Sequence, residues 1–447
     1  MFGLLESGYQ VFYWGNALMF VIAGALIYLG IAKKMEPLLL IPIGFGILLV
    51  NLPLGGLMDY QMDVRSPESG NVLQVQMHEG DRFQQGDIIC QLDSGEIAAP
   101  VFGRVDEFKI SPGQRVEAGD VVASVITMQQ TDQSKLPTEP IGLLSKIFKF
   151  GIMWQIIPPL MFLCLGALTD FGPMLANPKT LFLGAAAQFG VYFAFFMALL
   201  LGFTIPEACS IGIIGGAEGP TTIYVTSLLA PQIIGATAVA CYSYMALVPI
   251  ILPPVIRLLT SKRERAIYMK PQSREVSRLE KILFPIISAI VVILIVPMSA
   301  PLIGCFMTGN LLRECGVTER LSNTAQTSLV DMLTIFLTLS VGATMPAENF
   351  LLPKTLLVLG LGVVAFATAA ASGVILAKIM NLFSKEKINP MIGAAGVSAV
   401  PMSARVVQIM GQKENPRNFL LMHAMGPNVA GAIGAAIAGG VFLGMVG

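Results

Sequence analysis

Two stretches of this chain decide its fold: Gly212-Ile213-Ile214-Gly215-Gly216-Ala217-Glu218-Gly219-Pro220-Thr221 and Asn389-Pro390-Met391-Ile392-Gly393-Ala394-Ala395-Gly396-Val397-Ser398-Ala399-Val400-Pro401. Each lies in a strongly apolar region, and each combines Gly and Pro with polar side chains. Irregular backbone at membrane depth is tolerated only where it is buried in protein or lines a wet cavity. Two such breaks in matching halves of one chain are typical of the core of an ion-binding transporter.

The composition is that of a membrane protein. Of the 447 residues, 54% are hydrophobic and 13% are charged, whereas about a quarter of the residues of an ordinary globular domain are charged. The formal net charge is +0, so nothing in the charge predicts a nucleic-acid partner. The six cysteines are scattered without metal-ligand spacing, and we interpret them as small apolar residues.

Segments of about 20 apolar residues, enough to cross a bilayer, recur along the chain. They predict an all-α polytopic membrane protein with two broken helices. The expected spans lie at roughly 11–32, 36–57, 152–169, 181–203, 207–229 (broken), 231–256, 282–299, 300–313, 325–345, 353–378, 388–411 (broken) and 418–446.

The predicted organisation has five parts. They are two N-terminal membrane helices (1–58), a polar strand-like region (59–137), a first membrane repeat (138–256), a basic loop (257–281) and a second membrane repeat (282–447). Lys and Arg cluster in 257–281, and positive charge near membrane spans marks the cytoplasmic side. The orientation of the first two helices and the side that holds region 59–137 stay open.

Three pairs of matching motifs, in the same order, indicate that the membrane part is duplicated. A proline and an asparagine nine residues apart occur twice, and Gly-Ala followed by Pro-Lys-Thr-Leu also occurs twice. The two broken segments form the third pair. The matching positions are Pro42 and Asn51 with Pro301 and Asn310, Gly166-Ala167 and Pro178 with Gly342-Ala343 and Pro353, and Gly212, Gly215 and Pro220 with Gly393, Gly396 and Pro401. Hydropathy does not decide whether the two halves are inverted.

Region 59–137 contains a shorter repeat of its own and predicts a small β sandwich. Glu79-Gly80 matches Pro112-Gly113, and Gly86-Asp87 matches Gly119-Asp120, as Gly-Asp turns between short alternating strands. The region resembles a biotinyl/lipoyl carrier domain on its phrase from Ile97 to Val105. Carriers attach their cofactor to a lysine at a hairpin tip, and the tip here, 92–96, has none. We therefore expect no biotin on this chain and a structural or docking role.

Glu218 is the key residue of the first break. A carboxylate in the hydrocarbon region costs about 2.5–3.5 kcal/mol on insertion scales, so it needs partners or a function. The glycines beside it open the backbone, and Pro220 removes an amide donor. Freed carbonyls and the hydroxyls of Thr221 and Thr222 would suit a small hard cation. This set favours sodium modestly over a proton; the alternative is a protonated glutamate in a packed core.

The second break supplies further oxygen donors, Asn389, Ser398 and Ser403. Arg405 follows Ser398 by seven residues, about two helical turns, so both could face one cavity with an anion opposite the guanidinium. The alternative for Arg405 is a cation at a helix end that reaches for the interface. Tyr244 offers a phenol inside an apolar span, where packing is the common role.

At these residues the chain resembles the β subunit of sodium-pumping, biotin-dependent decarboxylases, which act on oxaloacetate, methylmalonyl-CoA, glutaconyl-CoA or malonate. The runs that carry the resemblance are 169–173, 177–180, 211–221, 242–249, 389–405 and 422–428. The resemblance implies two related repeats that form a core and a scaffold. It also implies sodium-site roles for the residues at Glu218, Asn389, Gly393 and Ser398, and functional roles for Arg405 and Tyr244.

The resemblance implies that the chain is an enzyme subunit that receives carboxybiotin from a partner carrier, decarboxylates it and exports sodium. Carboxybiotin would lie near Arg405 and Ser398, and Arg405, Tyr244 and Glu218 would act in catalysis. Expected partners are carboxyltransferase and biotin carrier subunits, a small membrane subunit and two further copies in a homotrimer.

Two departures from the family stand out in the sequence. The family's aspartate is Glu218 here, one methylene longer, and we expect only a short loop where this chain has region 59–137. The alternative function is a secondary sodium/proton or organic-anion transporter without a decarboxylase partner. It would share the broken helices and Glu218.

Overall fold

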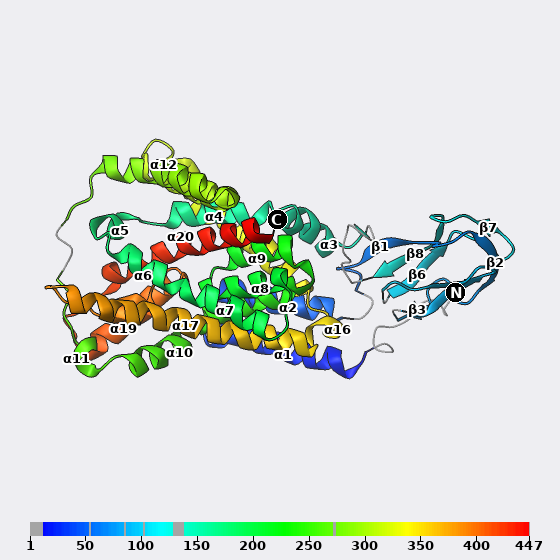
Figure 1. Cartoon of the computed structure of the whole chain (residues 1–447), viewed down its shortest axis with the longest axis horizontal. Coiled ribbons are helices and arrows are strands. Elements are labelled where there is room, and N and C mark those ends of the chain that lie inside the picture. Colours follow the sequence, from blue (N-terminus) through cyan, green and yellow to red (C-terminus); the bar gives the residue numbers. More distant parts are fainter. Residues whose placement is uncertain are drawn as a thin grey trace.

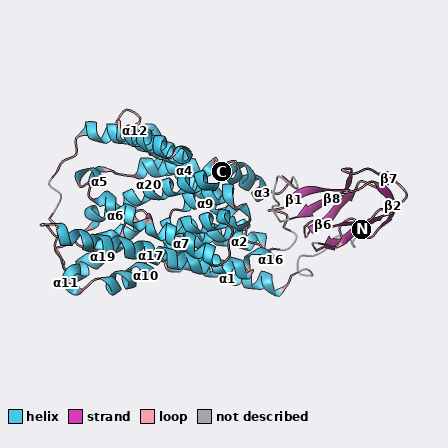
Figure 2. Ribbon diagram, viewed as in Figure 1, coloured by secondary structure: helices cyan, strands magenta, loops and turns pink. Residues whose placement is uncertain are grey.

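The computed structural model describes residues 12–52, 55–84, 86–101, 103–127, 138–270 and 274–446. A long helical body carries a β domain at one end of its long axis, and α11 (Lys262–Arg265) lies at the opposite end (Figure 1). The strands are confined to the β domain, and the rest of the chain is helical (Figure 2). The fold is therefore mostly helical, as the composition predicts.

The helical body is built from helices of very different lengths. Besides α11, they are α1 (Trp14–Ala32), α2 (Pro37–Val50), α3 (Leu143–Ile147), α4 (Ile157–Leu168), α5 (Gly172–Ala176), α6 (Thr180–Ala187), α7 (Phe189–Leu200), α8 (Ile205–Gly212), α9 (Gly219–Leu229), α10 (Ile234–Leu259), α12 (Arg278–Ile295), α13 (Ala300–Glu314), α14 (Glu319–Thr324), α15 (Val330–Ala343), α16 (Ala347–Phe350), α17 (Pro353–Phe383), α18 (Met391–Ala394), α19 (Met402–Glu414) and α20 (Leu421–Val446).

Within the described ranges, six helical segments are long and apolar enough to cross a membrane. They are Trp14–Ala32, Thr180–Leu200, Pro231–Leu259, Glu319–Ala343, Pro353–Phe383 and Leu421–Val446. A bent pair, Leu143–Met153 and Ile157–Leu168, would make a seventh. The chain is thus a multi-pass membrane protein, although several of the twelve expected spans are shorter helices.

The first helical segment of the bent pair, Leu143–Met153, does not continue in the direction of the second. The segment 143–153 meets α4 at an angle of 66°. Leu143 and Trp154 are 63% and 60% exposed, while Leu144, Phe148 and Ile152 are buried. A helix with one apolar face outward and one buried face fits the membrane interface.

Two sheets enclose one hydrophobic core in the β domain. Strand order is β3-β6-β8-β1-β9 in one sheet and β5-β4-β2-β7 in the other, with antiparallel pairs. The core contains side chains from both sheets, among them Val64, Val72 and Val105. The strands are β1 (Tyr60–Arg65), β2 (Gly70–Val75), β3 (Arg82–Phe83), β4 (Ile88–Leu92), β5 (Glu96–Ala98), β6 (Gly103–Phe108), β7 (Arg115–Val116), β8 (Val121–Thr127) and β9 (Thr138–Pro140).

The matching motifs of the β domain form matching turns. Their glycines all have positive φ, which favours glycine: Gly80 (φ 90), Gly113 (φ 85), Gly86 (φ 94) and Gly119 (φ 97). A carboxylate oxygen of Asp87 accepts from the Gln84 N–H at 2.6 Å, and one of Asp120 accepts from the Glu117 N–H at 2.8 Å. The shorter repeat seen in the sequence is therefore a repeat of backbone geometry.

The hairpin tip between β4 and β5 is closed by a hydrogen bond from the Leu92 N–H to the Gly95 carbonyl at 2.8 Å. Asp93 at this tip accepts from the backbone N–H and the side-chain amide of Asn71, both at 2.8 Å. The hydrogen bond from the Asn71 backbone, and to a smaller extent the one from its side chain, holds the pKa of Asp93 below its ordinary range. An acidic side chain, and no lysine, occupies this tip.

Two helix pairs in the body approach unusually closely at glycines. A Cβ at Gly166 of α4 or at Gly309 of α13 would lie 1.9 or 1.8 Å from a carbonyl oxygen of the other helix. In α2 and α15, a Cβ at Gly46 or Gly342 would lie 2.3 or 2.2 Å from one. No larger residue fits such distances, so these glycines set how closely each pair packs.

An asparagine closes each of these helix pairs in the same way. Asn310 of α13 donates to the carbonyls of Gly166 and Thr169 at the end of α4, at 3.3 and 2.9 Å. Asn51, just after α2, donates to the Met345 carbonyl just after α15 at 2.9 Å. The helix α16, which follows Met345, lies at the end of the body near the β domain, and α5, which follows Thr169, lies towards the opposite end (Figure 1).

Candidate functional site

The first broken segment is a hairpin that enters and leaves the body on one side. After α8 and a short 3-10 helix (Ile213–Gly216), the chain reverses at Ala217, whose φ of 52° is left-handed, and returns as α9. Gln232, beyond α9, donates to Glu207 at the start of α8 at 3.3 Å. Because the two ends of the segment are hydrogen-bonded to each other, the segment is re-entrant.

The second broken segment is also a hairpin. Its start and its end meet the same short stretch after α10: Asn389 donates to the Arg265 carbonyl at 2.8 Å, and Glu414 accepts from Arg265 Nε at 2.8 Å. Between these points, α18 leads inward and α19 leads back out. The prediction that 207–229 and 388–411 cross the membrane is wrong, because hydropathy carries no signal of chain reversal.

The two hairpins enter from opposite ends of α17, a helix of 31 residues and about 46 Å. At its first turn, Lys354 Nζ lies 2.7 Å from Glu207 Oε1 at the base of the first hairpin. Near its last turn, Asn381 donates to the Ile388 carbonyl at 2.7 Å, just before the second hairpin. One helix therefore fixes both bases.

The tips of the hairpins touch in the interior. The backbone N–H of Ser398 donates to the Gly216 carbonyl at 3.3 Å, and the Ser398 hydroxyl donates to Glu218 Oε2. Glu218 is 4% exposed and Ser398 is 1% exposed. The carboxylate identified from the sequence thus lies buried at the contact between the two breaks.

Small residues of α20 make room for both tips. A Cβ at Gly431 would lie 2.0 Å from the Gly396 carbonyl oxygen, and one at Gly439 would lie 3.0 Å from the methyl group of Thr221. Ala435 lies between these two positions and contacts Gly216. One helix therefore packs against both hairpins at the level of Glu218.

Buried oxygens without partners lie near the carboxylate. The hydroxyls of Thr221 and Tyr242 are buried and have no hydrogen-bond partner among the described residues. The Tyr242 ring contacts Gly219, the residue after Glu218, where a Cβ would lie 2.7 Å from the tyrosine oxygen. Buried hydroxyls are normally paired, so these two oxygens, with the carboxylate and Ser398, fit a hard cation better than a packed core.

The described residues contain no group of three or more His, Cys, Asp or Glu that could hold a metal ion. One carboxylate among hydroxyl and carbonyl oxygens is instead the donor set of alkali and alkaline-earth cations.

Comparison with known proteins identifies the family. The model of the Na+-transporting oxaloacetate decarboxylase beta subunit matches residues 15–446. The chain belongs to this family. It is 49% identical to the methylmalonyl-CoA decarboxylase subunit beta of Propionigenium modestum, over 99% of this chain and 98% of the relative. It is also 49% identical to the oxaloacetate decarboxylase beta chain 2 of Salmonella typhi, over 96% of this chain and 94% of that one.

The match also corrects one expectation about the β domain. The aligned region runs through residues 59–137, and the Propionigenium modestum relative is covered over 98% of its own length. Two chains covered so completely are alike in length through this region. The expectation that members of the beta-subunit family have only a short loop there is wrong, since the resemblance was judged on the membrane motifs alone.

Two of the residues that the family resemblance assigns to a sodium site lie away from the hairpin tips. The side-chain amide of Asn389 donates to the carbonyls of Arg265 and Ile267 at 2.8 and 3.0 Å, and its Oδ1 atom accepts from the Met391 N–H at 3.1 Å, all at the base of the second hairpin. Gly393 faces α17, where a Cβ would lie 2.1 Å from the Gly373 carbonyl oxygen. The structure thus gives both residues a packing role, and their place in a sodium site stays a prediction.

Arg405 and Tyr244 are not brought together with Glu218. Arg405 lies in the first turn of α19 and is exposed, whereas Ser398 is buried, and a cavity shared by the two stays a prediction. Its guanidinium interacts with the carboxylate of Glu36 in the turn before α2. The Tyr244 hydroxyl donates to the Leu359 carbonyl of α17.

Two residues at the tips were not singled out from the sequence. Besides Tyr242, the structure places Asn428 of α20 at the second tip, where its amide donates to the carbonyls of Ala395 and Val397 at 2.9 and 2.8 Å. The Asn428 Oδ1 atom is buried without a partner among the described residues. The available signal was the Gly426-Pro427 pair beside this asparagine, in a helix otherwise almost free of polar side chains.

Proposed function

We propose that this chain decarboxylates carboxybiotin delivered by a partner carrier and couples that reaction to sodium export. The observation that carries the proposal is the contact of Glu218 with Ser398, at which two hairpins from opposite sides meet. Membership in the family of Na+-transporting decarboxylase beta subunits supports the same reading. A secondary transporter would share the hairpins, but the family match does not favour it.

For the decarboxylation of carboxybiotin, the protein has to position the substrate and supply charged and proton-carrying groups. The N–C bond of carboxybiotin breaks, carbon dioxide leaves, the electron pair stays on the ureido nitrogen and that nitrogen takes up a proton. Arg405 would hold the carboxylate of the substrate, with Ser398 beside it. The hydroxyl of Tyr244 and the carboxyl group of Glu218 are the groups we assign to proton movement.

Sodium would be held by the carboxylate of Glu218 and by neutral oxygens around it. Ser398 lies in direct contact with the carboxylate, while Asn389 and Gly393 would support the second hairpin that carries it. Moving one sodium ion against 100 mV needs about 2.3 kcal/mol. Loss of the negative charge of carboxybiotin changes the field at the site, which provides a means of coupling.

The membrane orientation follows from the basic loop. Residues 257–281 carry eight Lys and Arg residues, which favours a cytoplasmic position for the end of the body that holds α11. The β domain then lies on the outside (Figure 1). In this orientation Lys33 and Lys34, which follow α1, also lie on the cytoplasmic side. The proposed location is the cytoplasmic membrane of a bacterium or archaeon.

We further infer that the membrane part consists of two inverted repeats. The pairs α4–α13 and α2–α15 share the glycine approach and the asparagine contact, and those contacts lie towards opposite ends of the body. The two hairpins likewise enter from opposite ends of α17. Inverted repeats with a site near the bilayer midplane are a recurrent transporter design.

The β domain is proposed to be a biotinyl/lipoyl-like fold without carrier function. Its two halves repeat the same glycine turns, and its hairpin tip carries Asp93 in place of a lysine. A position outside the membrane also separates it from a cytoplasmic carrier. The carboxyltransferase and carrier subunits would meet the other end, and a homotrimer with a small membrane subunit is the proposed assembly.

Reconstitution in liposomes with the partner subunits tests the function. Addition of the acyl substrate should drive sodium-22 into inverted vesicles, and avidin, which binds the biotin of the carrier, should stop it. Sodium movement that needs neither substrate nor carrier would identify a secondary transporter instead.

Two variants at position 218 test the site in the same vesicles. Glu218→Gln should lower sodium-dependent turnover to background, because the amide cannot replace the charge that a buried cation needs. Glu218→Asp keeps the charge and should retain activity with a changed apparent sodium affinity. Full coupled activity of Glu218→Gln would remove the carboxylate from the mechanism.

A further inference from the structure

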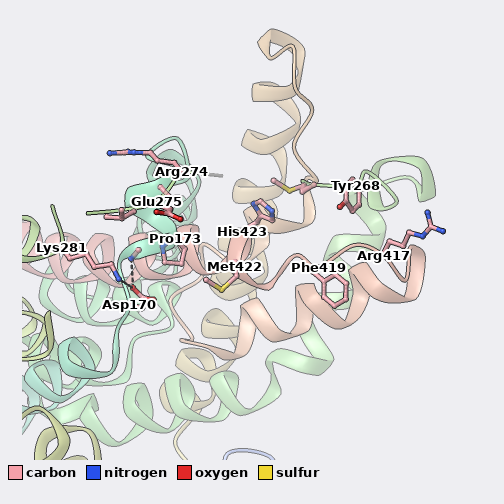
Figure 3. A pocket seen from close by; sticks show the side chains of 14 residues that line it. Asp170, Pro173, Tyr268, Arg274, Glu275, Lys281, Arg417, Phe419, Met422 and His423 are labelled. Carbon is pink, nitrogen blue, oxygen red and sulfur yellow. Dashed lines mark hydrogen bonds and ion pairs between the residues drawn. The ribbon is translucent and has the colours of Figure 1, made fainter. Parts of the chain in front are cut away.

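A cavity of about 600 Å³ opens at the end of the body that holds the basic loop. It is bounded by residues of the segment 170–176 after α4, by residues 268–269 and 274–276 before α12, and by residues 417–423 around the start of α20 (Figure 3). The cavity lies apart from Glu218 and from Tyr244, neither of which lines it. None of the residues assigned to the sodium or carboxybiotin site by family resemblance belongs to it.

The floor of this cavity carries a buried imidazole with a free nitrogen. His423 is 5% exposed, and its Nδ1 atom has no hydrogen-bond partner among the described residues. Figure 3 shows its ring between Tyr268 and Met422 in the middle of the cavity. A buried polar atom without a partner is uncommon, so this nitrogen has an unused capacity to accept a hydrogen bond.

The walls offer apolar surface and positive charge. Phe419 and Met422 are 66% and 53% exposed, although exposure of large apolar side chains to water is unfavourable. Arg417 lies at one end of the cavity, and its guanidinium makes no hydrogen bond or ion pair with any described residue. At the other end, Lys281 lies 3.9 Å from Asp170, an ion pair long enough for a bound anion to compete.

We propose that this cavity receives the carboxylated ureido ring of the partner's biotin on its way to the hairpin tips. The inference rests on the proposed function and adds the place of docking. Carboxybiotin keeps one ureido N–H donor for His423 Nδ1, presents a planar ureido face and an apolar sulfur-containing ring to Phe419, and carries a negative charge for Arg417. A simple inorganic anion would use the cation but neither the ring surface nor the acceptor nitrogen.

The cavity is connected to the hairpin tips by α20. His423 lies in the first turn of this helix, and Gly431, which contacts the second tip, follows eight residues later, about 12 Å along the axis. Asn428, whose amide binds the carbonyls of the second tip, lies between them. A ligand bound at His423 therefore acts on the same helix that packs against both hairpins.

Binding of biocytin, the lysine conjugate of biotin, to the full-length protein in detergent provides the test. Titration by saturation-transfer NMR should show that His423→Leu raises the dissociation constant at least about tenfold, since one hydrogen bond to a buried group contributes about that factor. His423→Gln, which keeps an acceptor, should recover part of the affinity. Phe419→Ala should weaken binding as well. The matched control is His78→Leu on the exposed surface of the β domain, which should leave binding unchanged.

Two outcomes would overturn the inference: equal biocytin affinity in the parent and in His423→Leu, or displacement of biocytin by millimolar inorganic phosphate, which would identify a plain anion site. Sodium-22 uptake by the parent complex keeps this test separate from the proposed function. If the parent pumps sodium while His423→Leu binds biocytin normally, only the docking site is wrong. If the parent pumps nothing, the function itself fails.

Discussion

At the scale of single residues, the site combines one buried acid with oxygens that have no partner inside the protein. The hydroxyl of Ser398 donates a hydrogen bond to Glu218, while the buried hydroxyls of Thr221 and Tyr242 have no hydrogen-bond partner among the described residues. An unpaired buried hydroxyl destabilises a fold unless a ligand uses it. The sequence identified Glu218 because a charge among glycines in an apolar segment is a local signal. The sequence did not identify Tyr242, because the role of this residue depends on a contact with Gly219 that only the folded chain creates.

Replacement of Thr221 by valine separates a ligand hydroxyl from an unused one. If the hydroxyl binds sodium, Thr221→Val raises the half-saturating sodium concentration by about fivefold, the value of one lost polar contact. Sodium-dependent turnover of the reconstituted complex measures this. Thr226→Val, about one and a half turns further along α9, removes a hydroxyl paired with Thr237 at 3.3 Å and should leave sodium affinity unchanged. If sodium affinity is unchanged in Thr221→Val and only stability rises, the hydroxyl has no part in the site.

Close packing of α17 on the second hairpin is testable at a single glycine. Gly373→Ala would bring a methyl group within 2.1 Å of the Gly393 carbonyl oxygen and should cost about 1–3 kcal/mol of unfolding free energy. Gly360→Ala in the same helix meets open space and should stabilise by about 0.5–1 kcal/mol. Circular dichroism melts of both variants in detergent give the comparison, and equal melting points would contradict the packing.

At the scale of elements, the two hairpins are positioned by their bases as much as by their tips. Glu207 has 5% of its side chain exposed and is held by Lys354 and Gln232. The second base is held through Arg265 and Asn389. The sequence located both breaks correctly because Gly and Pro disrupt helices locally. It missed the reversal of the chain, because the apolar pattern is the same whether a segment crosses or returns.

The base of the first hairpin should loosen when its cation is removed. Lys354→Met leaves Glu207 buried without its charge partner. We expect the free energy of unfolding of the hairpin to fall by about 1–3 kcal/mol, a value between those for exposed and buried ion pairs. Hydrogen exchange measured by mass spectrometry should rise in peptides of 204–233 and stay constant in the β domain. Adding Glu207→Gln to this variant removes the unpaired charge and should restore protection. No recovery in the double variant would mean that Lys354 acts through packing on Phe203, whose ring centroid lies 5.3 Å away.

At the scale of the whole molecule, the basic loop and the β domain lie at opposite ends of one long body. Composition alone predicted a polytopic helical protein, because an excess of apolar residues excludes ordinary globular domains. The side of the β domain could not be predicted, since the short loops near it carry few charges. It follows only when the helices are traced in space from the basic loop.

Accessibility of introduced cysteines tests this orientation. In a background without the native cysteines, Ser94→Cys at the tip of the β hairpin should react with a membrane-impermeant maleimide in intact cells. Lys262→Cys in α11 should react only in inverted vesicles, which expose the cytoplasmic side. The opposite pattern would reverse the proposed direction of sodium transport as well as the position of the domain.

The proposed extracytoplasmic position has a consequence for the buried thiol of the β domain. Cys90 is 0% exposed and is the single cysteine in region 59–137. Extracytoplasmic compartments favour disulfide formation, yet this thiol has no partner within its own domain, so oxidation requires local opening and then joins two molecules. Stability of the small sandwich therefore also protects the complex against disulfide cross-linking in an oxidising environment.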